Sequence, residues 1–541
     1  MKSWLIAGLC VLLPFVGFGQ ISTFSRTDSL HGYLSAEKVN YDVTSYDLEV
    51  KLDPNVQRLA GTSTIHFKAV ETLRRIQVDL HSNLRIANIL FEGKRTVYKR
   101  DRHAVFIEFP TRLLKGNTYS VSIIYGGNPT PSINPPWDGG TSWKTDQSGN
   151  PWFFVHSQNK GAYAWWPCKD HLSDKADYGS ITLIVPEGME AVSCGSIESS
   201  KLLPGRFQQT KWKINHPFSP QEISCFVGKY NRIEDHLSIG SREIDITYYV
   251  FPEMKKKAIL HFEQIRKILL TYEKLIGPYP FPEDGFKIVQ TNYWGSAHHG
   301  LMAYGGDYQN NTFGFDYSLA HEAAYAWFGQ AVSASDPGDI WLAHSWATYL
   351  EGLYVEETYG YEVSLDWLAT LTPRINNQYP ITAPQGVHYQ QWKDSDRYYK
   401  GAWMLHSLRN LVNNDVRWFE TIRDFYLKFQ YRSLDTETFI SFFNQRLGRD
   451  YTPFFRQYLY HSRLPVLAYD VKEGGKRSNL RYKWIVDEKG FIMPVNAIIG
   501  REKVRLYPTD KWESLEEKIS SPRKLQWDMS SALFQTKRER L

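Results

Sequence analysis

The pattern of apolar and polar positions changes character twice along the 541 residues of this chain. From Tyr41 to about Asn231, apolar and polar residues alternate in short runs separated by turn residues, as in Ser180–Pro186. A period of two is typical of strands with one buried face, and the regular turn signals indicate antiparallel neighbours. We therefore predict an N-terminal antiparallel β domain over residues 20–235.

A helical period replaces this alternation in the second half of the chain. Apolar residues follow helical spacing from Lys255 to Ile276, a Gly277-Pro-Tyr-Pro-Phe-Pro282 break follows, and Tyr317–His461 is predominantly helical. Short alternating runs then return near the end. The pattern predicts an α+β multidomain protein, with a mostly helical domain over 236–462 and a small β domain over 463–541.

The first residues have the pattern of an export signal. Lys2 precedes an apolar run from Trp4 to Val16, and the small residues Gly17 and Gly19 follow it. This order predicts a cleavable signal peptide over residues 1–19 and a secreted or periplasmic protein. The apolar run is too short to span a bilayer, and no later stretch matches its hydrophobicity, so we expect no membrane span.

Charge and cysteine content narrow the remaining classes. The formal charge of +5 is not gathered into Lys/Arg runs, which argues against nucleic acid as a partner. Beyond the signal, the cysteines are Cys168, Cys194 and Cys225, an odd number that permits at most one disulfide within the chain. Cys168 with Cys194 is the pairing to test, and buried free thiols are the alternative.

The segment His321-Glu-Ala-Ala-Tyr325, followed by Trp341–Glu351, carries residues suited to metal chemistry. It resembles the paired helices of the aminopeptidase N family of zinc metallopeptidases, the gluzincins. There the first helix carries H-E-x-x-H and the next carries a third ligand, a glutamate. Residues four apart share one helix face, so both imidazoles reach one metal while the intervening Glu activates its water.

The spacing matches this family, but two of the three ligand positions hold other residues. The resemblance implies metal positions at His321, Tyr325 and His344, with Glu322 as the water-activating residue. Tyr325 stands where the second His belongs, and His344 stands where the ligand Glu belongs. Tyr325 would ligate only as a phenolate, and ionising a phenol of pKa near 10 at pH 7 costs about 4 kcal/mol. Neutral imidazole, in contrast, is a good zinc ligand.

Other segments extend the resemblance from about Tyr41 into the C-terminal β region. Trp165-Trp-Pro-Cys-Lys-Asp170 and Asp174-Lys-Ala176 are similar to the family's W-F-P-C-x-D and D-K-A signatures. Arg397-Tyr-Tyr-Lys-Gly401 is similar to its Y-x-K-G element, which implies that Tyr398 is the residue that stabilises the oxyanion.

The segment Trp294–Tyr304 lies where the family has its G-x-M-E-N strand. The Glu that holds the free amino terminus of a substrate falls on Ala297 in one register and on Ala303 in the other. In both registers the carboxylate is missing. The resemblance implies substrate contacts at Ala297 and His298.

Two arrangements of the cleft histidines follow from these replacements. In the first, His321, His344 and either His298 or His299 form a relocated three-histidine metal site, with zinc as the cofactor. In the second, the cleft holds no metal and the histidines hydrogen-bond one another, Tyr325 and Glu322. The second is the more economical, because ligand geometry must be correct to within a few tenths of an ångström.

Several nearby residues have simpler interpretations. Asp316 and Ser318 are expected to cap the helix, and the helix tryptophans and phenylalanine are expected to be core: Trp327, Phe328, Trp341 and Trp346.

The resemblance implies an N-terminal β domain, a thermolysin-like catalytic domain and a C-terminal β domain. We expect an exported aminopeptidase-like protein with lost or reduced hydrolysis, whose cleft takes a peptide or protein ligand. The alternatives are an active zinc metallopeptidase with substituted ligands, and a structural component of a cell-surface assembly.

Overall fold

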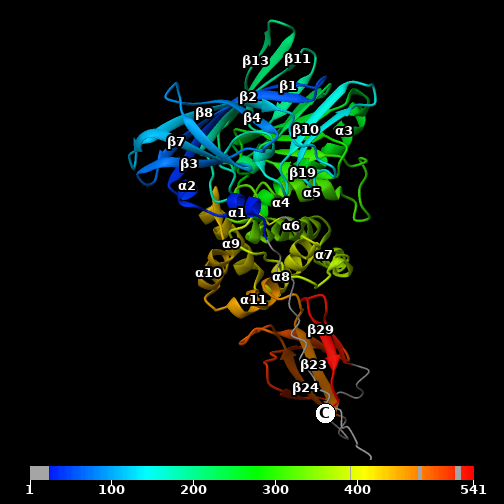
Figure 1. The fold of residues 1–541 in the computed structure, drawn as a ribbon. Coiled ribbons are helices and arrows are strands. Elements are labelled where there is room, and N and C mark those ends of the chain that lie inside the picture. Colours follow the sequence, from blue (N-terminus) through cyan, green and yellow to red (C-terminus); the bar gives the residue numbers. More distant parts are fainter. Residues whose placement is uncertain (1–23, 390–391, 473–477, 518–524, 541) are drawn as a thin grey trace, which may run out of the picture.

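The computed structural model describes residues 24–389, 392–472, 478–517 and 525–540 (Figure 1). The predicted signal peptide, residues 1–19, lies outside this part of the chain. A β-rich region, a helical region and a smaller β region follow one another along the long axis of the molecule (Figure 1). This order confirms the α+β multidomain architecture expected from the changes of period.

The N-terminal region is built on an eight-stranded sheet of order β13-β14-β11-β1-β2-β8-β4-β5. Along its central strand β1, Leu48, Val50 and Leu52 are buried and alternate with exposed Glu49 and Lys51, as the period of two requires. The sheet is antiparallel, as predicted, except where β1 pairs in parallel with β11. Two smaller sheets have the orders β12-β15-β10-β9 and β3-β7-β6.

The elements of this region are α1 (Arg26–Gly32), α2 (Ala36–Val39), β1 (Tyr41–Asp53), β2 (Arg58–Ala69), β3 (Leu73–Asp79), β4 (Leu84–Phe91), β5 (Lys94–Arg95), β6 (Val97–Asp101), β7 (Ala104–Leu113), β8 (Thr118–Gly127), β9 (Gly140–Thr145), β10 (Pro151–His156), η1 (Ala162–Ala164), β11 (Tyr178–Pro186), β12 (Glu190–Ser193), β13 (Ser196–Leu203), β14 (Phe207–Ile214), η2 (Pro220–Glu222) and β15 (Cys225–Gly228).

The central region combines a five-stranded sheet, of order β16-β17-β18-β20-β19, with a set of helices. Its strand β16 begins at Asn231, so the hairpin β16–β17 belongs to the central sheet. The predicted boundary at residue 235 therefore falls inside a strand, and the change of region lies at about residue 230. Sequence alternation could not place this boundary, because β strands lie on both sides of it.

The elements of the central region are β16 (Asn231–Ile239), β17 (Arg242–Val250), η3 (Pro252–Met254), α3 (Lys255–Phe262), α4 (Gln264–Leu275), β18 (Phe286–Gln290), β19 (Gly295–His298), β20 (Leu301–Tyr304), α5 (Tyr317–Ala324), β21 (Val332–Ala334), η4 (Pro337–Asp339), α6 (Trp341–Tyr359), α7 (Tyr361–Ala369), η5 (Thr372–Arg374), α8 (Asp396–Val412), α9 (Asp415–Phe429), β22 (Arg432–Leu434), α10 (Thr436–Leu447) and α11 (Thr452–Leu459).

The C-terminal region forms a four-stranded sheet, β27-β24-β23-β29, and a three-stranded sheet, β26-β25-β28. Its first strand, β23, begins at Val466, shortly after α11 ends at Leu459. Its strands are β23 (Val466–Lys472), β24 (Ser478–Ile485), β25 (Val495–Ile499), β26 (Glu502–Leu506), β27 (Glu513–Glu517), β28 (Leu525–Trp527) and β29 (Gln535–Arg538).

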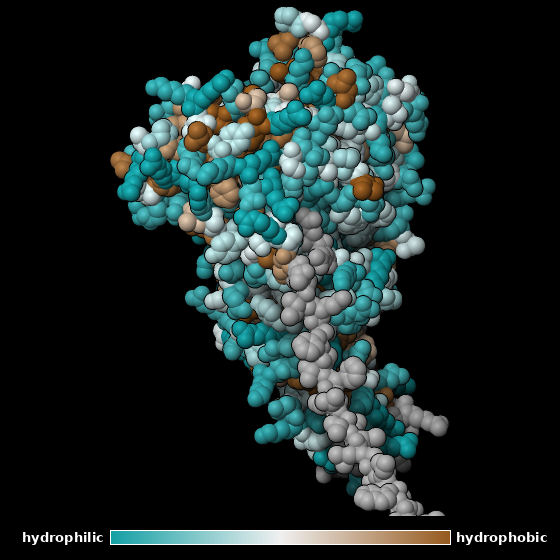
Figure 2. All heavy atoms as spheres, viewed as in Figure 1, coloured by the Kyte–Doolittle hydropathy of each residue, from teal (hydrophilic) through white to brown (hydrophobic). Residues whose placement is uncertain are grey.

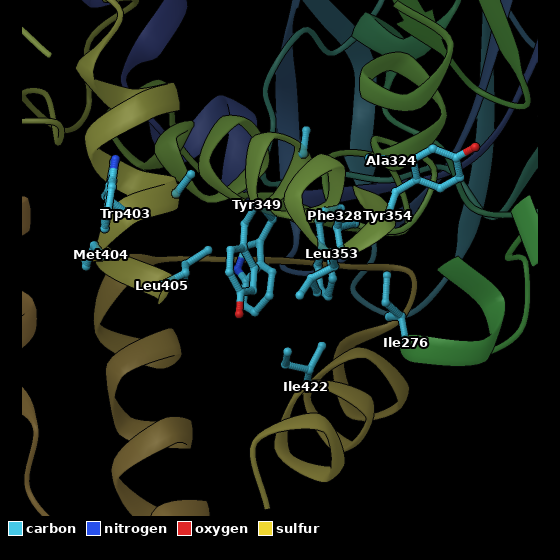
Figure 3. Close-up of a cluster of buried hydrophobic side chains, with 14 of the residues drawn as sticks. Ile276, Ala324, Phe328, Tyr349, Leu353, Tyr354, Trp403, Met404, Leu405 and Ile422 are labelled. Carbon is cyan, nitrogen blue, oxygen red and sulfur yellow. The ribbon is translucent and has the colours of Figure 1, made fainter. Parts of the chain in front are cut away.

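Two apolar cores hold these regions together. One fills the N-terminal sheets, and the other runs without a break from the central sheet through the helices into the C-terminal strands. Figure 3 shows Phe328, Tyr349 and Leu353 gathered beside Ile422 in this second core. Trp327, Phe328, Trp341 and Trp346 are all buried there, which confirms their interpretation as core residues.

The three described cysteines, Cys168, Cys194 and Cys225, are buried free thiols. The Cys168–Cys194 pairing to be tested is therefore not formed, and the expectation of buried free thiols is confirmed. Burial raises the pKa of all three thiols, that of Cys194 to about 12, so they are protonated at neutral pH and behave as small apolar side chains.

Within the described residues, no helix has both the length and the apolar character needed to cross a bilayer. The face shown in Figure 2 is mainly hydrophilic, with apolar residues scattered over it.

Candidate functional site

A cavity of about 680 Å³ opens between the N-terminal β region and the helices of the central region. The edge strand β19 forms one side, and α5, α6 and the start of α8 form the others. Seven of the residues predicted from sequence line it together: Ala297, His298, His321, Glu322, Tyr325, His344 and Tyr398. The fold therefore assembles the predicted site from segments spread over about a hundred residues.

Helix α5 brings His321 and Glu322 into the cavity. The Asp316 carboxylate caps the helix by accepting hydrogen bonds from the backbone N–H groups of Ser318 (2.8 Å) and Leu319 (3.4 Å), as expected for its position. The same carboxylate accepts hydrogen bonds from the side chains of His261 and Tyr304, which fixes the start of the helix to the central sheet.

The segment that follows α5 is wound more loosely than an α-helix. Three successive backbone N–H groups, those of Gln330, Ala331 and Val332, bond to carbonyls five residues earlier. Gly329 has φ of +141°, and a Cβ there would lie 2.5 Å from the ring of Tyr325. Glycine at this position therefore lets the Tyr325 ring lie against the backbone.

Helix α6 places His344 and Glu351, two turns apart, on the side of the site. The Nδ1 atom of His321 lies 2.5 Å from Glu351 Oε1, and Glu351 is fully buried. Burial raises the pKa of the Glu351 carboxyl well above its usual range and lowers the pKa of His321. The protonated carboxyl of Glu351 therefore donates a hydrogen bond to the neutral imidazole of His321, and both side chains are buried.

Tyr325 and His344 are hydrogen-bonded to each other, with 2.5 Å between the phenolic oxygen and Nδ1. Burial raises the pKa of Tyr325 well above 10 and, with the nearby Arg397 charge, lowers the pKa of His344 well below 6.5. The neutral phenol therefore donates to a neutral imidazole, whose own proton lies on Nε2. The Tyr398 ring stacks on His344 with 4.2 Å between ring centres.

Glu322 is buried in the cavity wall, and burial raises the pKa of its carboxyl to about 7. The neighbouring His321 acts in the opposite direction and does not offset the desolvation. A Cβ added at Gly295 would come within 2.9 Å of Glu322 Oε1, so this glycine on β19 makes room for the carboxyl group.

The two registers proposed for the strand Trp294–Tyr304 are distinguished by the sheet. Ala297 lies on the edge strand β19 and lines the cavity, whereas Ala303 lies on the inner strand β20 and is fully buried. His298 also lines the cavity, and its Nε2 lies 3.2 Å from Ser296 Oγ. His299 points elsewhere: its Nε2 lies 2.8 Å from Asp284 Oδ2.

Comparison with known proteins shows which family this architecture belongs to. The model of the peptidase M1 N-terminal domain matches residues 42–220, and that of the peptidase family M1 domain matches residues 314–458. Together these matches cover more than half of the chain. The chain belongs to the M1 peptidase family. This confirms the resemblance to the aminopeptidase N family.

The relatives of this M1 chain share its fold at low sequence identity. Endoplasmic reticulum aminopeptidase 1 of Homo sapiens is 21% identical over 57% of the chain, and tricorn protease-interacting factor F2 of Thermoplasma acidophilum is 25% identical over 47%. The chain spans about a third of the length of these curated relatives (34%). The M1 zinc metallopeptidase from Deinococcus radiodurans has a TM-score of 0.67 at 22% identity, covering 79% of this chain and 95% of its own.

The residues at the M1 metal position do not fit the zinc ion of that family. The two replaced ligands, Tyr325 and His344, use their ligand atoms on each other, and the proton on His344 Nε2 blocks its second nitrogen. Arg397, whose charge lowers the pKa of His344, would also repel a cation there. His321 is the one family ligand retained.

The relocated three-histidine site is not assembled either. Within the part of the chain that the structure describes, one group of three or more His, Cys, Asp or Glu side chains has ligand atoms within 4.8 Å of one another. It consists of His216, Asp284 and His299, and it contains none of His298, His321 and His344. The second alternative from sequence was that the cleft histidines hydrogen-bond one another and their neighbours. The bond between Tyr325 and His344 is a contact of this kind.

Two residues of this site were missed by the sequence analysis. Glu351 is a carboxylate on a helix whose residues 341–351 are otherwise uncharged and buried, and its spacing of seven from His344 puts both on one helix face. Arg397 lies in the segment similar to Y-x-K-G, but nothing in that motif indicates that its guanidinium stacks on Trp392 at 4.4 Å inside the cavity.

Proposed function

We propose that this protein is an exported M1-fold protein that has lost peptide hydrolysis and binds peptides in the cavity between its β and helical regions. The single observation that carries the proposal is the hydrogen bond between Tyr325 and His344. It joins side chains at two of the three family ligand positions and leaves Glu322 without a metal-bound water to activate. Export rests on the apolar segment that follows Lys2.

The lining of the cavity supports a peptide ligand. Aromatic rings of Tyr317, Tyr398 and Tyr399 and the cations Arg374 and Arg397 offer stacking surfaces and partners for backbone carbonyls and carboxylates. The family's grip on a free amino terminus is absent, because Ala297 has no carboxylate. We therefore propose that binding is insensitive to whether the peptide begins with a free amine.

The loss of hydrolysis is tested with aminoacyl reporter substrates. Purified full-length protein, with and without added zinc, is expected to release the reporter at the uncatalysed rate. Turnover that is abolished in a Glu322→Gln variant would overturn the proposal, and would favour an active metallopeptidase with substituted ligands.

Peptide binding is tested separately by calorimetry. One M1 zinc metallopeptidase of Deinococcus radiodurans was solved with a Tyr-Ser-Ala substrate, so this tripeptide and its N-acetylated form are suitable probes. We expect the two forms to bind with similar affinity. In an Ala297→Glu variant, the matched control, the free-amine form should bind better by about tenfold, which corresponds to one charged hydrogen bond.

Failure of both peptides to bind, with an intact fold, would contradict the peptide-binding half of the proposal. A protein that neither hydrolyses nor binds peptides would then be assigned to a structural role in a surface assembly.

A further inference from the structure

We infer that His216, Asp284 and His299 form a binding site for one divalent transition-metal ion, outside the position that the M1 family uses. The three side chains, called the His216 cluster below, come from the segment after β14, the loop before β18 and the turn between β19 and β20. The inference is independent of the proposed function, because neither hydrolysis nor peptide binding enters the argument.

The ligand atoms of the His216 cluster all lie within 4.8 Å of one another. Asp284 Oδ2 lies 3.0 Å from His216 Nδ1 and 2.8 Å from His299 Nε2. Ligands at right angles around an ion, each at about 2.1 Å, are separated by about 3.0 Å. Two imidazoles and one carboxylate are also a common donor set for Zn²⁺, Fe²⁺ and related ions. An ion would take the place of the protons that now lie between the imidazoles and Asp284.

Each imidazole of the cluster has a second carboxylate at its other nitrogen. Glu283 Oε2 lies 2.8 Å from His216 Nε2, and Glu222 Oε2 lies 3.7 Å from His299 Nδ1. Metal-binding histidines usually donate their remaining N–H to such a carboxylate, which fixes the tautomer and orients the ring. His216 therefore has the outer partner that is typical of a metal ligand, and Glu222 lies close to His299 Nδ1 but beyond hydrogen-bond distance.

The remaining carboxylate oxygen is also held in place. Asp284 Oδ1 accepts hydrogen bonds from both the backbone N–H and the side-chain amide of Asn215, each at 2.9 Å. These bonds turn Oδ2 toward the two imidazoles. The rings themselves are fixed by aromatic contacts, His299 against Phe281 at 4.0 Å and His216 against Tyr431 at 5.8 Å.

Two buried polar atoms lack a hydrogen-bond partner among the described residues: His299 Nδ1 of the His216 cluster and Glu222 Oε2 beside it, which lie 3.7 Å apart. A neutral His299 that ligates an ion through Nε2 carries its proton on Nδ1, directed at this glutamate. In the bound state, a small approach of the two side chains would therefore pair both atoms.

Burial and access also suit an ion. The side chains of Asp284 and His299 are fully buried, whereas that of His216 is 14% exposed and Glu283 is 65% exposed. An ion would therefore enter past His216 and lose most of its water inside. Because His216 belongs to the N-terminal region and the other two ligands to the central region, the ion would also join the two regions.

The test is metal titration of the chelator-stripped full-length protein, with Zn²⁺ and Co²⁺ as probes. We expect one equivalent to bind by calorimetry and elemental analysis, with a metal-dependent rise in Tm. His216→Ala should weaken binding more than 100-fold, whereas the exposed control His236→Ala should leave it unchanged. Glu283→Ala, an exposed change that does not endanger the fold, should weaken binding 10- to 100-fold.

The variants also separate this site from the family position. His344→Ala should retain the full equivalent of metal. Absence of binding in the wild type, or full binding by both His216→Ala and Glu283→Ala, would overturn the inference and leave the proposed function untouched. Metal lost in His344→Ala but kept in His216→Ala would overturn both, because the ion would then lie at the family position.

Discussion

The family metal position and the His216 cluster contain similar side chains in opposite electrostatic arrangements. At the family position, Tyr325 and His344 are neutral and bonded to each other, with Arg397 close by. In the His216 cluster, one carboxylate oxygen lies between two imidazoles, and further carboxylates lie behind each ring. The comparison teaches that an inherited position does not make a metal site: an ion can replace the protons between a carboxylate and two imidazoles, whereas a neutral phenol–imidazole pair beside an arginine offers a cation no negative charge.

The largest effect, on zinc content and hydrolysis, is expected from restoring the ligands at the M1 family's metal position. The changes Ala297→Glu, Tyr325→His and His344→Glu, made in a His216→Ala background, should add about one zinc per chain, because they restore a two-histidine, one-carboxylate set. Hydrolysis of aminoacyl reporters should then rise above that of the His216→Ala parent. Elemental analysis after dialysis measures the first result, and initial rates measure the second.

A folded triple variant without zinc would contradict this expectation. It would mean that Arg397, or the hydrogen bond of His321 to Glu351, keeps a cation away even when the ligands are restored.

The next effect concerns the charge at the centre of the His216 cluster. In metal-free protein, Asp284→Ala should reduce the free energy of unfolding by about 3–5 kcal/mol, because it leaves two buried imidazoles without their shared acceptor. Urea denaturation measures the change. The exposed Asp245→Ala is the matched control and should change stability little. If Asp284→Ala lowered the free energy of unfolding no more than the control does, the Asp284 carboxylate would not be what holds the two imidazoles in place.

The pH dependence of stability probes the family position. Burial raises the pKa of Glu322 from 4.5 to about 7, so the folded protein keeps a proton that the unfolded chain releases between these pH values. Stability from this group is therefore present at low pH and is lost as pH rises through that window. A glutamine at this position does not titrate, so the Glu322→Gln variant does not lose this stability as pH rises. The free energy of unfolding of the variant minus that of the wild type should therefore increase by about 1–3 kcal/mol between pH 4 and pH 8.

Denaturation curves at the two pH values give this difference, with the exposed Glu243→Gln as the control. If the difference in free energy of unfolding between Glu322→Gln and the wild type stayed the same from pH 4 to pH 8, the raised pKa of Glu322 would be contradicted. That result would be expected if a cation near Glu322 kept its carboxyl ionised.

The smallest effect on stability is expected from removing the hydrogen bond between Tyr325 and His344. Tyr325→Phe removes the donor and leaves His344 Nδ1 unpaired in a buried site, which should cost about 1–2 kcal/mol. Tyr178→Phe, at a residue that is 56% exposed, is the control. If Tyr325→Phe were as stable as this control, water or another donor would have replaced the phenol, and the two ligand positions would be less firmly joined than we propose.

Much of the fold and of the site could be predicted from sequence, because both depend on local patterns. The change from a period of two to helical spacing marked the helical region, and the spacing of His321, Tyr325 and His344 placed all three in one cavity. The boundary at residue 235 was wrong because strands continue across it. The free thiols agree with one of the two interpretations of the cysteines, which the sequence left open because an odd number of cysteines limits disulfides without requiring one.

The roles of the histidines were harder to predict, since their partners are distant in sequence. His298 and His299 are neighbours, yet one lines the cavity and the other faces Asp284, because strand β19 ends at His298 and His299 lies in the turn that follows. Glu351 was overlooked because its partner His321 lies 30 residues earlier on another helix.

The sequence by itself determined that two family ligands are replaced and that the amino-terminus-binding glutamate is absent, because these are statements about residue identity at motif positions. Only the tertiary structure decided which atoms meet. In the folded chain, Tyr325 lies within hydrogen-bond distance of His344, and His216, Asp284 and His299 from separate loops lie together. Hydrogen bonds and metal sites depend on distances of about 3 Å, which no sequence spacing specifies.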